Sequence, residues 1–221
     1  MGRHGVPSAL AIGSIVPDLW YFIPFVDRAD SHALAGLVWF CLPAGVVAYA
    51  LFHVVLKDPL IALLSPRLAC FTCAGLPQRP WYAVVVSLLT GAGTHFLWDA
   101  LTHSNAHVVD GIRWSQHAST MAGMAILAWW IARKLSRASP PAGSGHEPAF
   151  LRVCAVVAFA GAMLVTALWS ADAWPTPDVA ALRHFLRTAG IGAIEGLAAT
   201  LFAYCVVWQL RAKRATSGSR R

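Results

Sequence analysis

The sequence predicts an all-α, polytopic membrane protein: a helical bundle with about five transmembrane helices. Hydrophobic residues make up 57% of the 221 residues and charged residues only 12%, whereas a soluble domain is about a quarter charged. Several apolar runs approach the ~20 residues that a helix needs to cross a bilayer. The net charge is +7, but the basic residues lie between these runs and form no basic–aromatic stripe. We therefore expect the lipid bilayer, and no nucleic acid, as a partner.

Five apolar runs are the expected transmembrane helices. In chain order they are Leu34–Leu56, Trp81–Leu101, Ala118–Ala132, Val153–Ala171 and Ala189–Leu210. The third run is short, and its helix could begin near Trp114. An earlier apolar stretch, Val6–Val26, is interrupted by prolines. It is either a sixth span or a re-entrant segment that leans on the bundle.

The segments between the runs are loops or linkers. Residues Asp58–Pro80 are rich in proline and predict a loop with a short interfacial helix. Residues Ser136–Pro148 are rich in Ser, Pro, Ala and Gly, which is typical of a flexible linker. We therefore expect a single transmembrane bundle domain over residues 1–210 and a basic, disordered tail over residues 211–221.

Lys and Arg residues predict the orientation, because cytoplasmic loops are enriched in them. With the basic tail in the cytoplasm, the linker and the proline-rich loop also fall on the cytoplasmic side. The basic residues that fall on the opposite side are Arg28, Arg113, Arg183 and Arg187. Most histidines and carboxylates also fall on this outer side, although the topology was assigned from Lys and Arg alone.

The strongest motif lies at the outer end of the second run, where His95, Asp99 and His103 are spaced four residues apart. On an α-helix this spacing places all three side chains on one face. Two imidazoles and a carboxylate are ligands for Zn²⁺ or a similar divalent ion. An alternative is that His95 and Asp99 only hydrogen-bond to each other and fix helix packing.

Three further residues are candidate ligands, each with a second interpretation. Pro17 should hold Val16 out of helical conformation and expose Asp18 at a chain reversal. Asp18 could instead cap a short helix. His32 and His117 could each be a ligand or a solvated residue at the membrane interface.

These motifs combine into a pattern that spans most of the chain up to about Trp130. The pattern is Gly13-Ser14-x-x-Pro17-Asp18-x-x-Tyr21-Phe22, Ser31-His32, Gly93-Thr94-His95-x-x-x-Asp99-x-x-Thr102-His103 and Gln116-His117-x-Ser119. It resembles a bacterial family of multi-pass membrane proteins of unknown function. That family is similar to membrane-bound proteins predicted to be metal-dependent hydrolases.

The resemblance implies a metal site, and a bacterial family implies the inner membrane; the cytoplasmic C-terminus is expected from Lys and Arg alone. The implied ligands are Asp18, His32, His95 and Asp99, and the further candidates are His103 and His117. One departure concerns the start of the pattern. Such proteins usually carry an extra His-bearing segment before the first motif, and here only His4 precedes it.

Three functions are compatible with the sequence. The first is a metal-dependent hydrolase acting on a lipid-like or phosphoester substrate at the outer membrane face, with Asp18 or Asp99 as general base. The second is ion or solute transport, since Glu195 and His53 lie within apolar runs and intramembrane ionisable groups often mark ion paths. The third is a non-catalytic structural or assembly protein. The sequence specifies neither the substrate nor the oligomeric state.

Overall fold

The computed structural model describes residues 5–63, 79–102, 108–109, 112–136, 149–170 and 179–218. It divides the chain into two compact units. The first unit comprises Met1–His53 and Cys70–Ala142, and the second comprises Val54–Ala69 and Gly143–Arg221. Most of the predicted linker and most of the predicted proline-rich loop lie outside the described residues.

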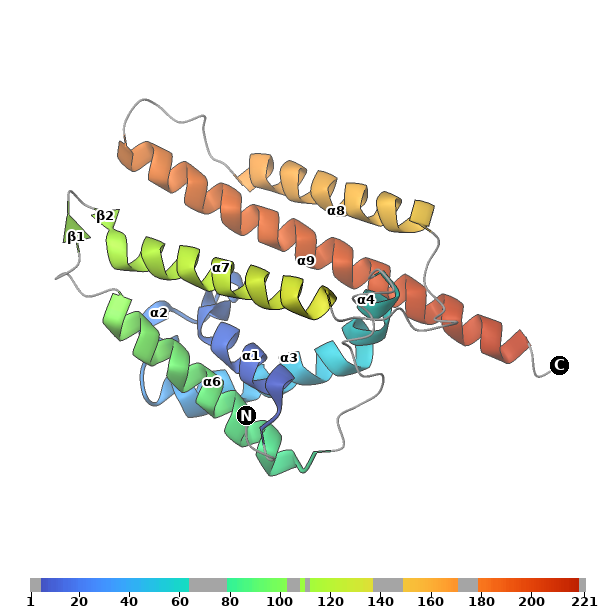
Figure 1. Ribbon diagram of the computed structural model, residues 1–221, viewed down its shortest axis with the longest axis horizontal. Coiled ribbons are helices and arrows are strands. Elements are labelled where there is room, and N and C mark those ends of the chain that lie inside the picture. Colours follow the sequence, from blue (N-terminus) through green and yellow to red (C-terminus); the bar gives the residue numbers. More distant parts are fainter. Residues whose placement is uncertain are drawn as a thin grey trace. The chain divides into compact units, whose positions relative to one another are not determined.

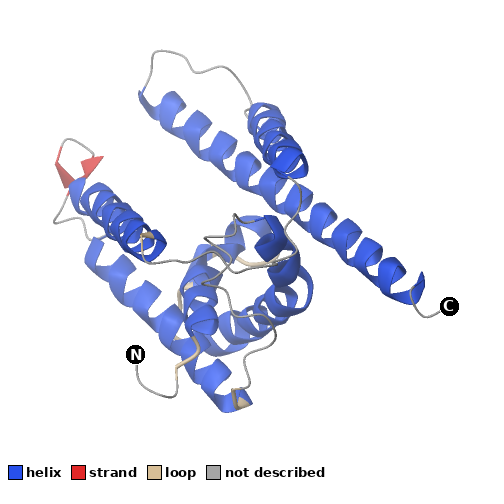
Figure 2. Ribbon diagram, turned by 45° about the vertical axis from the view of Figure 1, so that its right-hand side comes forward, coloured by secondary structure: helices blue, strands red, loops and turns tan. Residues whose placement is uncertain are grey.

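The regular secondary structure of the described residues is helical, apart from one short hairpin, whose strands are red in Figure 2. Strand β1 (Val108–Val109) pairs antiparallel with β2 (Ile112–Arg113). The predicted helical class is therefore confirmed, and the hairpin is an addition that the sequence did not suggest.

Four described helices are long and apolar enough to cross a membrane. They are Leu37–Leu63, Trp81–Thr102, Phe150–Trp169 and Ala180–Ala212. The structure thus supports a helical membrane protein with four candidate spans, one fewer than expected. The run expected as the third span forms α7 (Trp114–Leu135), which is not among the four. Polar residues at both ends of α7, such as His117 and Arg133, lower its mean hydropathy.

The N-terminal apolar stretch forms two short helices. They are α1 (Pro7–Ile15) and the 3₁₀ helix η1 (Val16–Phe22). Nine residues of α-helix rise about 14 Å, half the thickness of a bilayer core. The backbone N–H of Val6, just before α1, donates to Ser87 Oγ at 3.0 Å. The structure therefore favours a segment that leans on the bundle over a sixth span.

Two glycines allow α1 to lie against α6 (Trp81–Thr102), as seen in Figure 1. A Cβ atom added to Gly13 would collide with the carbonyl oxygen of Leu88, and one added to Gly91 would collide with that of Leu10. Both positions therefore require glycine for close packing of the two backbones. This contact lies next to Ser14 and one turn before His95, so it positions two residues of the site described below.

The span Leu37–Leu63 follows α2 (Arg28–Ser31) and alternates π-helical and α-helical turns. In order these are η2 (Leu37–Cys41), α3 (Leu42–Leu51), η3 (Phe52–Leu56) and α4 (Lys57–Leu63). Each π segment ends shortly before a proline, Pro43 or Pro59. A proline has no N–H to donate and its ring clashes with the preceding turn, so the helix widens there.

In the second unit, α8 (Ala149–Ser170) packs along α9 (Val179–Gly218), as Figures 1 and 2 both show. Gln209 Nε2 donates to the carbonyl oxygen of Val54 at 3.3 Å, which joins α9 to the segment before α4. Helix α9 continues to Gly218, where the sequence suggested a disordered tail from residue 211. Residues 212–215 are Ala, Lys, Arg and Ala, which extend an existing helix readily.

Candidate metal centre

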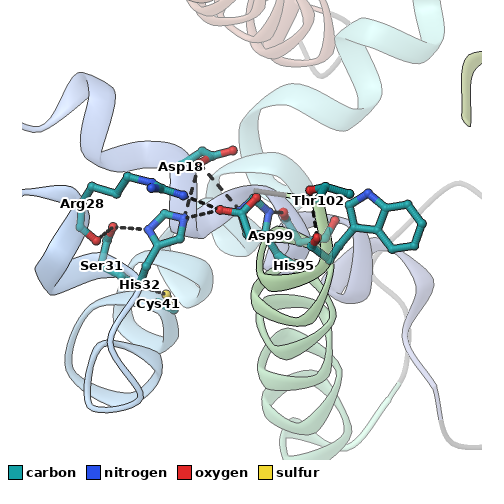
Figure 3. Close-up of polar contacts among 10 residues, drawn as sticks. Asp18, Arg28, Ser31, His32, Cys41, His95, Asp99 and Thr102 are labelled. Atoms are coloured by element: carbon teal, nitrogen blue, oxygen red, sulfur yellow. Dashed lines mark hydrogen bonds and ion pairs between the residues drawn. The ribbon is translucent and has the colours of Figure 1, made fainter. Parts of the chain in front are cut away.

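Three side chains from separate parts of the first unit meet at one point. Asp18 comes from η1, His32 directly follows α2, and His95 lies on α6. One ligand-type atom of each lies within 4.8 Å of the others. The Nε2 atoms of both histidines are 3.7 Å from Asp18 Oδ1. Figure 3 shows these side chains pointing toward one another.

The backbone of α1 determines which nitrogen of His95 carries the proton. His95 Nδ1 lies 2.8 Å from the carbonyl oxygen of Ser14. A carbonyl oxygen only accepts, so Nδ1 is the donor, and in the neutral ring Nε2 then holds a lone pair. His95 Nε2 is buried and has no hydrogen-bond partner.

His32 has the same arrangement through a different partner. Its Nδ1 lies 2.8 Å from Ser31 Oγ, and the Ser31 hydroxyl donates to the carbonyl oxygen of Arg28 at 3.3 Å. The hydroxyl has one proton; with that proton on the Arg28 carbonyl, His32 Nδ1 donates to Oγ and Nε2 again holds the lone pair. His32 Nε2 is also buried without a hydrogen-bond partner.

The surroundings of His32 favour its neutral ring. Burial and the neighbouring Arg28 guanidinium lower the pKa of His32 below its ordinary value, against the opposing effect of Asp99 and Asp18. Neutral imidazole is the form that binds a metal ion, because its free nitrogen supplies the electron pair.

Two lone pairs and a carboxylate oxygen thus face a common point, an arrangement that is unfavourable without a cation. Two imidazoles and one carboxylate form a common ligand set for Zn²⁺ and other divalent first-row metals. Histidine ligands characteristically donate their other N–H to a carbonyl or similar acceptor, as both rings do here. Asp18, His32 and His95 therefore fit a divalent ion.

Asp99 lies one turn after His95 and borders this group. Its Oδ2 is 3.5 Å from His32 Nε2 and 2.7 Å from Arg28 Nη2, and its Oδ1 is 4.0 Å from His95 Nε2. A separation of 4.0 Å is too long for a hydrogen bond. The alternative in which His95 and Asp99 only hydrogen-bond to each other is therefore not what the structure shows.

Arg28 is the site residue that sequence reasoning missed. The sequence suggested only that it is one of few basic residues on the outer side. Its position follows from the cap of α2: Asp27 Oδ1 accepts from the backbone N–H of Asp30 at 2.8 Å, so Arg28 is the first helical residue. That Asp-x-x-Asp cap was the available signal, but nothing in the sequence related Arg28 to Asp99.

The local structure around Asp18 fits neither of the two interpretations drawn from the sequence. Val16 is helical, with φ −55° and ψ −40°, so the expectation that Pro17 holds it out of helix is wrong. The chain instead tightens from α-helix to 3₁₀ helix at this point, which accommodates the proline. Asp18 lies in the first turn of η1, whose N-cap is Ile15.

The remaining candidate ligands differ in where they lie. The side chain of His32 is only 14% exposed, which does not fit a solvated interfacial residue. His117 is exposed on α7 and is not part of the three-residue group. His103 follows the end of α6 and lies outside the described residues.

The group lies at the ends of two candidate spans. His32 shortly precedes the span that begins at Leu37, and Asp99 occupies the last turn of the span that ends at Thr102. A ligand would therefore reach this site from the surface of the bilayer.

Comparison with known proteins establishes the family of the chain. No curated protein and no solved structure matches it. Residues 1–206 match the family described as "Domain of unknown function (DUF4184)", and the chain therefore belongs to this family.

Proposed function

We propose that this protein is a metal-dependent hydrolase that cleaves a phosphoester, such as a lipid-like one, at the membrane surface. The observation that carries the proposal is the pair of buried Nε2 atoms of His32 and His95, both directed toward Asp18. Their Nδ1 partners hold the rings in the orientation that a metal ligand needs. The donor set fits Zn²⁺.

The residues around the group suit phosphoester hydrolysis. A divalent ion in such a site polarises a phosphoryl oxygen and makes a water molecule more acidic. The carboxylate of Asp99 borders the group and would accept a proton from an attacking water. Arg28 is half-exposed, and a guanidinium binds phosphate oxygens through paired hydrogen bonds. This favours a phosphoester over a carboxylic ester.

The proposed location is the outer face of a bacterial inner membrane, with the C-terminus in the cytoplasm. The distribution of Lys and Arg supports this orientation, which requires α7 to cross the bilayer as a fifth span; its 22 residues are long enough to do so. The motif resemblance to membrane-bound proteins predicted to be metal-dependent hydrolases supports the activity. The site at the ends of two candidate spans suits a substrate whose phosphate lies at the lipid headgroup level.

Metal analysis of the detergent-purified protein is the first test. We expect stoichiometric zinc or another divalent metal, removable by a chelator and restored by added Zn²⁺. Asp18→Asn should lose most of this metal. Asp58→Asn, which changes an exposed carboxylate on α4, is the matched control and should retain it.

Hydrolysis of aryl phosphate monoesters and diesters by the same preparations is the second test. We expect turnover by the metal-loaded protein and none after chelation. A protein that purifies without stoichiometric metal and takes up none from solution would rule out the proposal. A protein that binds metal through Asp18 but cleaves no phosphoester would instead have a non-catalytic, structural metal site.

A further inference from the structure

The second unit contains a separate feature, a cavity, and none of the residues of the metal centre. A cavity of about 390 Å³ opens between α4, α8 and α9, and all of its lining residues belong to the second unit. Cavities that bind small molecules have volumes of about 300–1,000 Å³. This cavity is therefore large enough for part of an extended apolar ligand.

The lining combines apolar side chains with one permanent cation. Leu63 of α4, Leu151 and Ala155 of α8, and Val207 and Trp208 of α9 form much of the apolar wall. Arg211 is the charged residue among the described residues of the lining, which include no carboxylate. An apolar wall beside a guanidinium is complementary to a hydrocarbon chain attached to an anion.

The position of the cavity within the helices adds to this argument. Leu63 is the last residue of its candidate span, Leu151 is the second of another, and Arg211 is next to the end of a third. Three span ends therefore meet at the cavity, the level at which lipid headgroups lie. The adjoining parts of the same helices carry three further basic residues, Lys57, Arg152 and Arg214, and one acidic residue, Asp58.

We propose that this cavity binds an anionic phospholipid of the surrounding bilayer, with an acyl chain along the apolar wall and the phosphate at Arg211. Basic pockets between transmembrane helices on the cytoplasmic side are a known means of selecting anionic lipids. The Lys and Arg pattern of the chain places this end of the unit on that side. The site is independent of the proposed hydrolase and would exist in a catalytically silent protein.

Lipid retention by the full-length protein tests the proposal. The protein would be extracted from vesicles of phosphatidylglycerol and phosphatidylcholine with identical acyl chains, and retained lipid counted by native mass spectrometry. We expect retained phosphatidylglycerol to exceed phosphatidylcholine about fivefold, the effect of one basic residue at an anionic surface. Arg211→Ala should abolish this preference. Arg187→Ala, which removes another exposed arginine of α9 outside the cavity, should leave it unchanged.

Two further measurements address the acyl chain. Ala155→Phe fills the cavity but keeps Arg211, so it should lower retention of both lipids. Cys154 also lines the cavity and is exposed. In a variant that keeps it as the sole cysteine, its maleimide labelling should be about fivefold slower in phosphatidylglycerol than in phosphatidylcholine.

Two results would overturn the proposal. If the wild-type protein retains the two lipids equally, as Arg211→Ala is expected to, the cavity does not select an anion. Cys154 that resists labelling in lipid-free detergent would show that protein, from this chain or a second copy, covers the cavity.

Discussion

Three described histidines of the first unit are of two kinds, and they differ in which ring nitrogen is engaged. His53, inside the span Leu37–Leu63, has its Nε2 atom 3.0 Å from Ser8 Oγ, and its ring lies 4.4 Å from that of Tyr49. His32 and His95 instead use Nδ1 for their hydrogen bonds and direct Nε2 toward Asp18. His53 is the most buried of the three residues, so burial alone does not distinguish a metal ligand from a packing residue.

The difference shows what makes a histidine available to a metal ion. A ring whose Nε2 is engaged by a hydroxyl contributes to helix packing, here between α1 and the span Leu37–Leu63. What the second ring nitrogen faces decides whether a ring can share a metal ion, and the Nε2 atoms of His32 and His95 both face Asp18. At the candidate centre that partner is a carboxylate, which cannot donate a proton when ionised. Metal binding should therefore depend on His32 and His95 and be independent of His53.

The largest expected effect follows from substituting one histidine of each kind. At a Zn²⁺ concentration 100-fold above Kd, the ion should stabilise the wild-type protein by about 2.7 kcal/mol. His95→Ala should abolish this stabilisation. His53→Ala should keep it, while losing about 1–3 kcal/mol of stability without metal, because a buried contact is removed. Thermal unfolding in detergent with and without Zn²⁺ measures both quantities.

The distinction between the two kinds of histidine is wrong if His53→Ala loses the zinc-dependent stabilisation while His95→Ala keeps it. Loss in both variants, with the zinc content of His53→Ala unchanged, would mean that the unfolding measurement reports helix packing and not metal occupancy. Metal analysis of the same samples separates these outcomes.

A smaller effect is expected from the glycine that lets α1 approach α6. A methyl group at Gly91 would collide with the carbonyl oxygen of Leu10 and push Ser14 away from His95. Gly91→Ala should cost about 1–3 kcal/mol of stability and weaken zinc binding by about 10–100-fold, as expected when a supporting hydrogen bond is lost. Zinc titration of the purified variant measures the second effect.

Gly93→Ala is the matched control on the same helix. Nothing lies within 4 Å of the Cβ that it would add, and alanine favours helix over glycine by about 1 kcal/mol. It should therefore bind zinc as the wild type does and unfold no earlier. Equal zinc affinity in both alanine variants would show that the Ser14 carbonyl does not set the ring of His95.

Much of the fold was predictable because apolar runs and helix spacing are local signals. The second run was expected at Trp81–Leu101 and forms α6 at Trp81–Thr102. Its motif also placed His95 and Asp99 on one helical face, where both border the same site. Helix ends were less predictable, because no apolar run marks the last part of α9, beyond residue 212 and up to Gly218.

The site itself was predictable only in part, because its decisive contacts join residues far apart in the chain. Ser14 lies 81 residues from His95, and Arg28 lies 71 residues from Asp99. One of these contacts uses a backbone carbonyl, which has no residue signature. The glycines that bring the backbones together indicate close packing only after their neighbours are known. Sequence motifs therefore pointed to the ligands but not to the groups that orient them.

The smallest expected effect concerns His117, which the motif resemblance made a further candidate ligand. It lies exposed on α7, outside the group formed by Asp18, His32 and His95. Zinc commonly takes three protein ligands and leaves one position for water or substrate, so a fourth histidine is not needed. His117→Ala should therefore bind zinc within about twofold of the wild type, less than the roughly tenfold loss of even a supporting contact. A tenfold or greater loss in zinc titration would mean that His117 reaches the ion, and the open position that hydrolysis requires would then be occupied by protein.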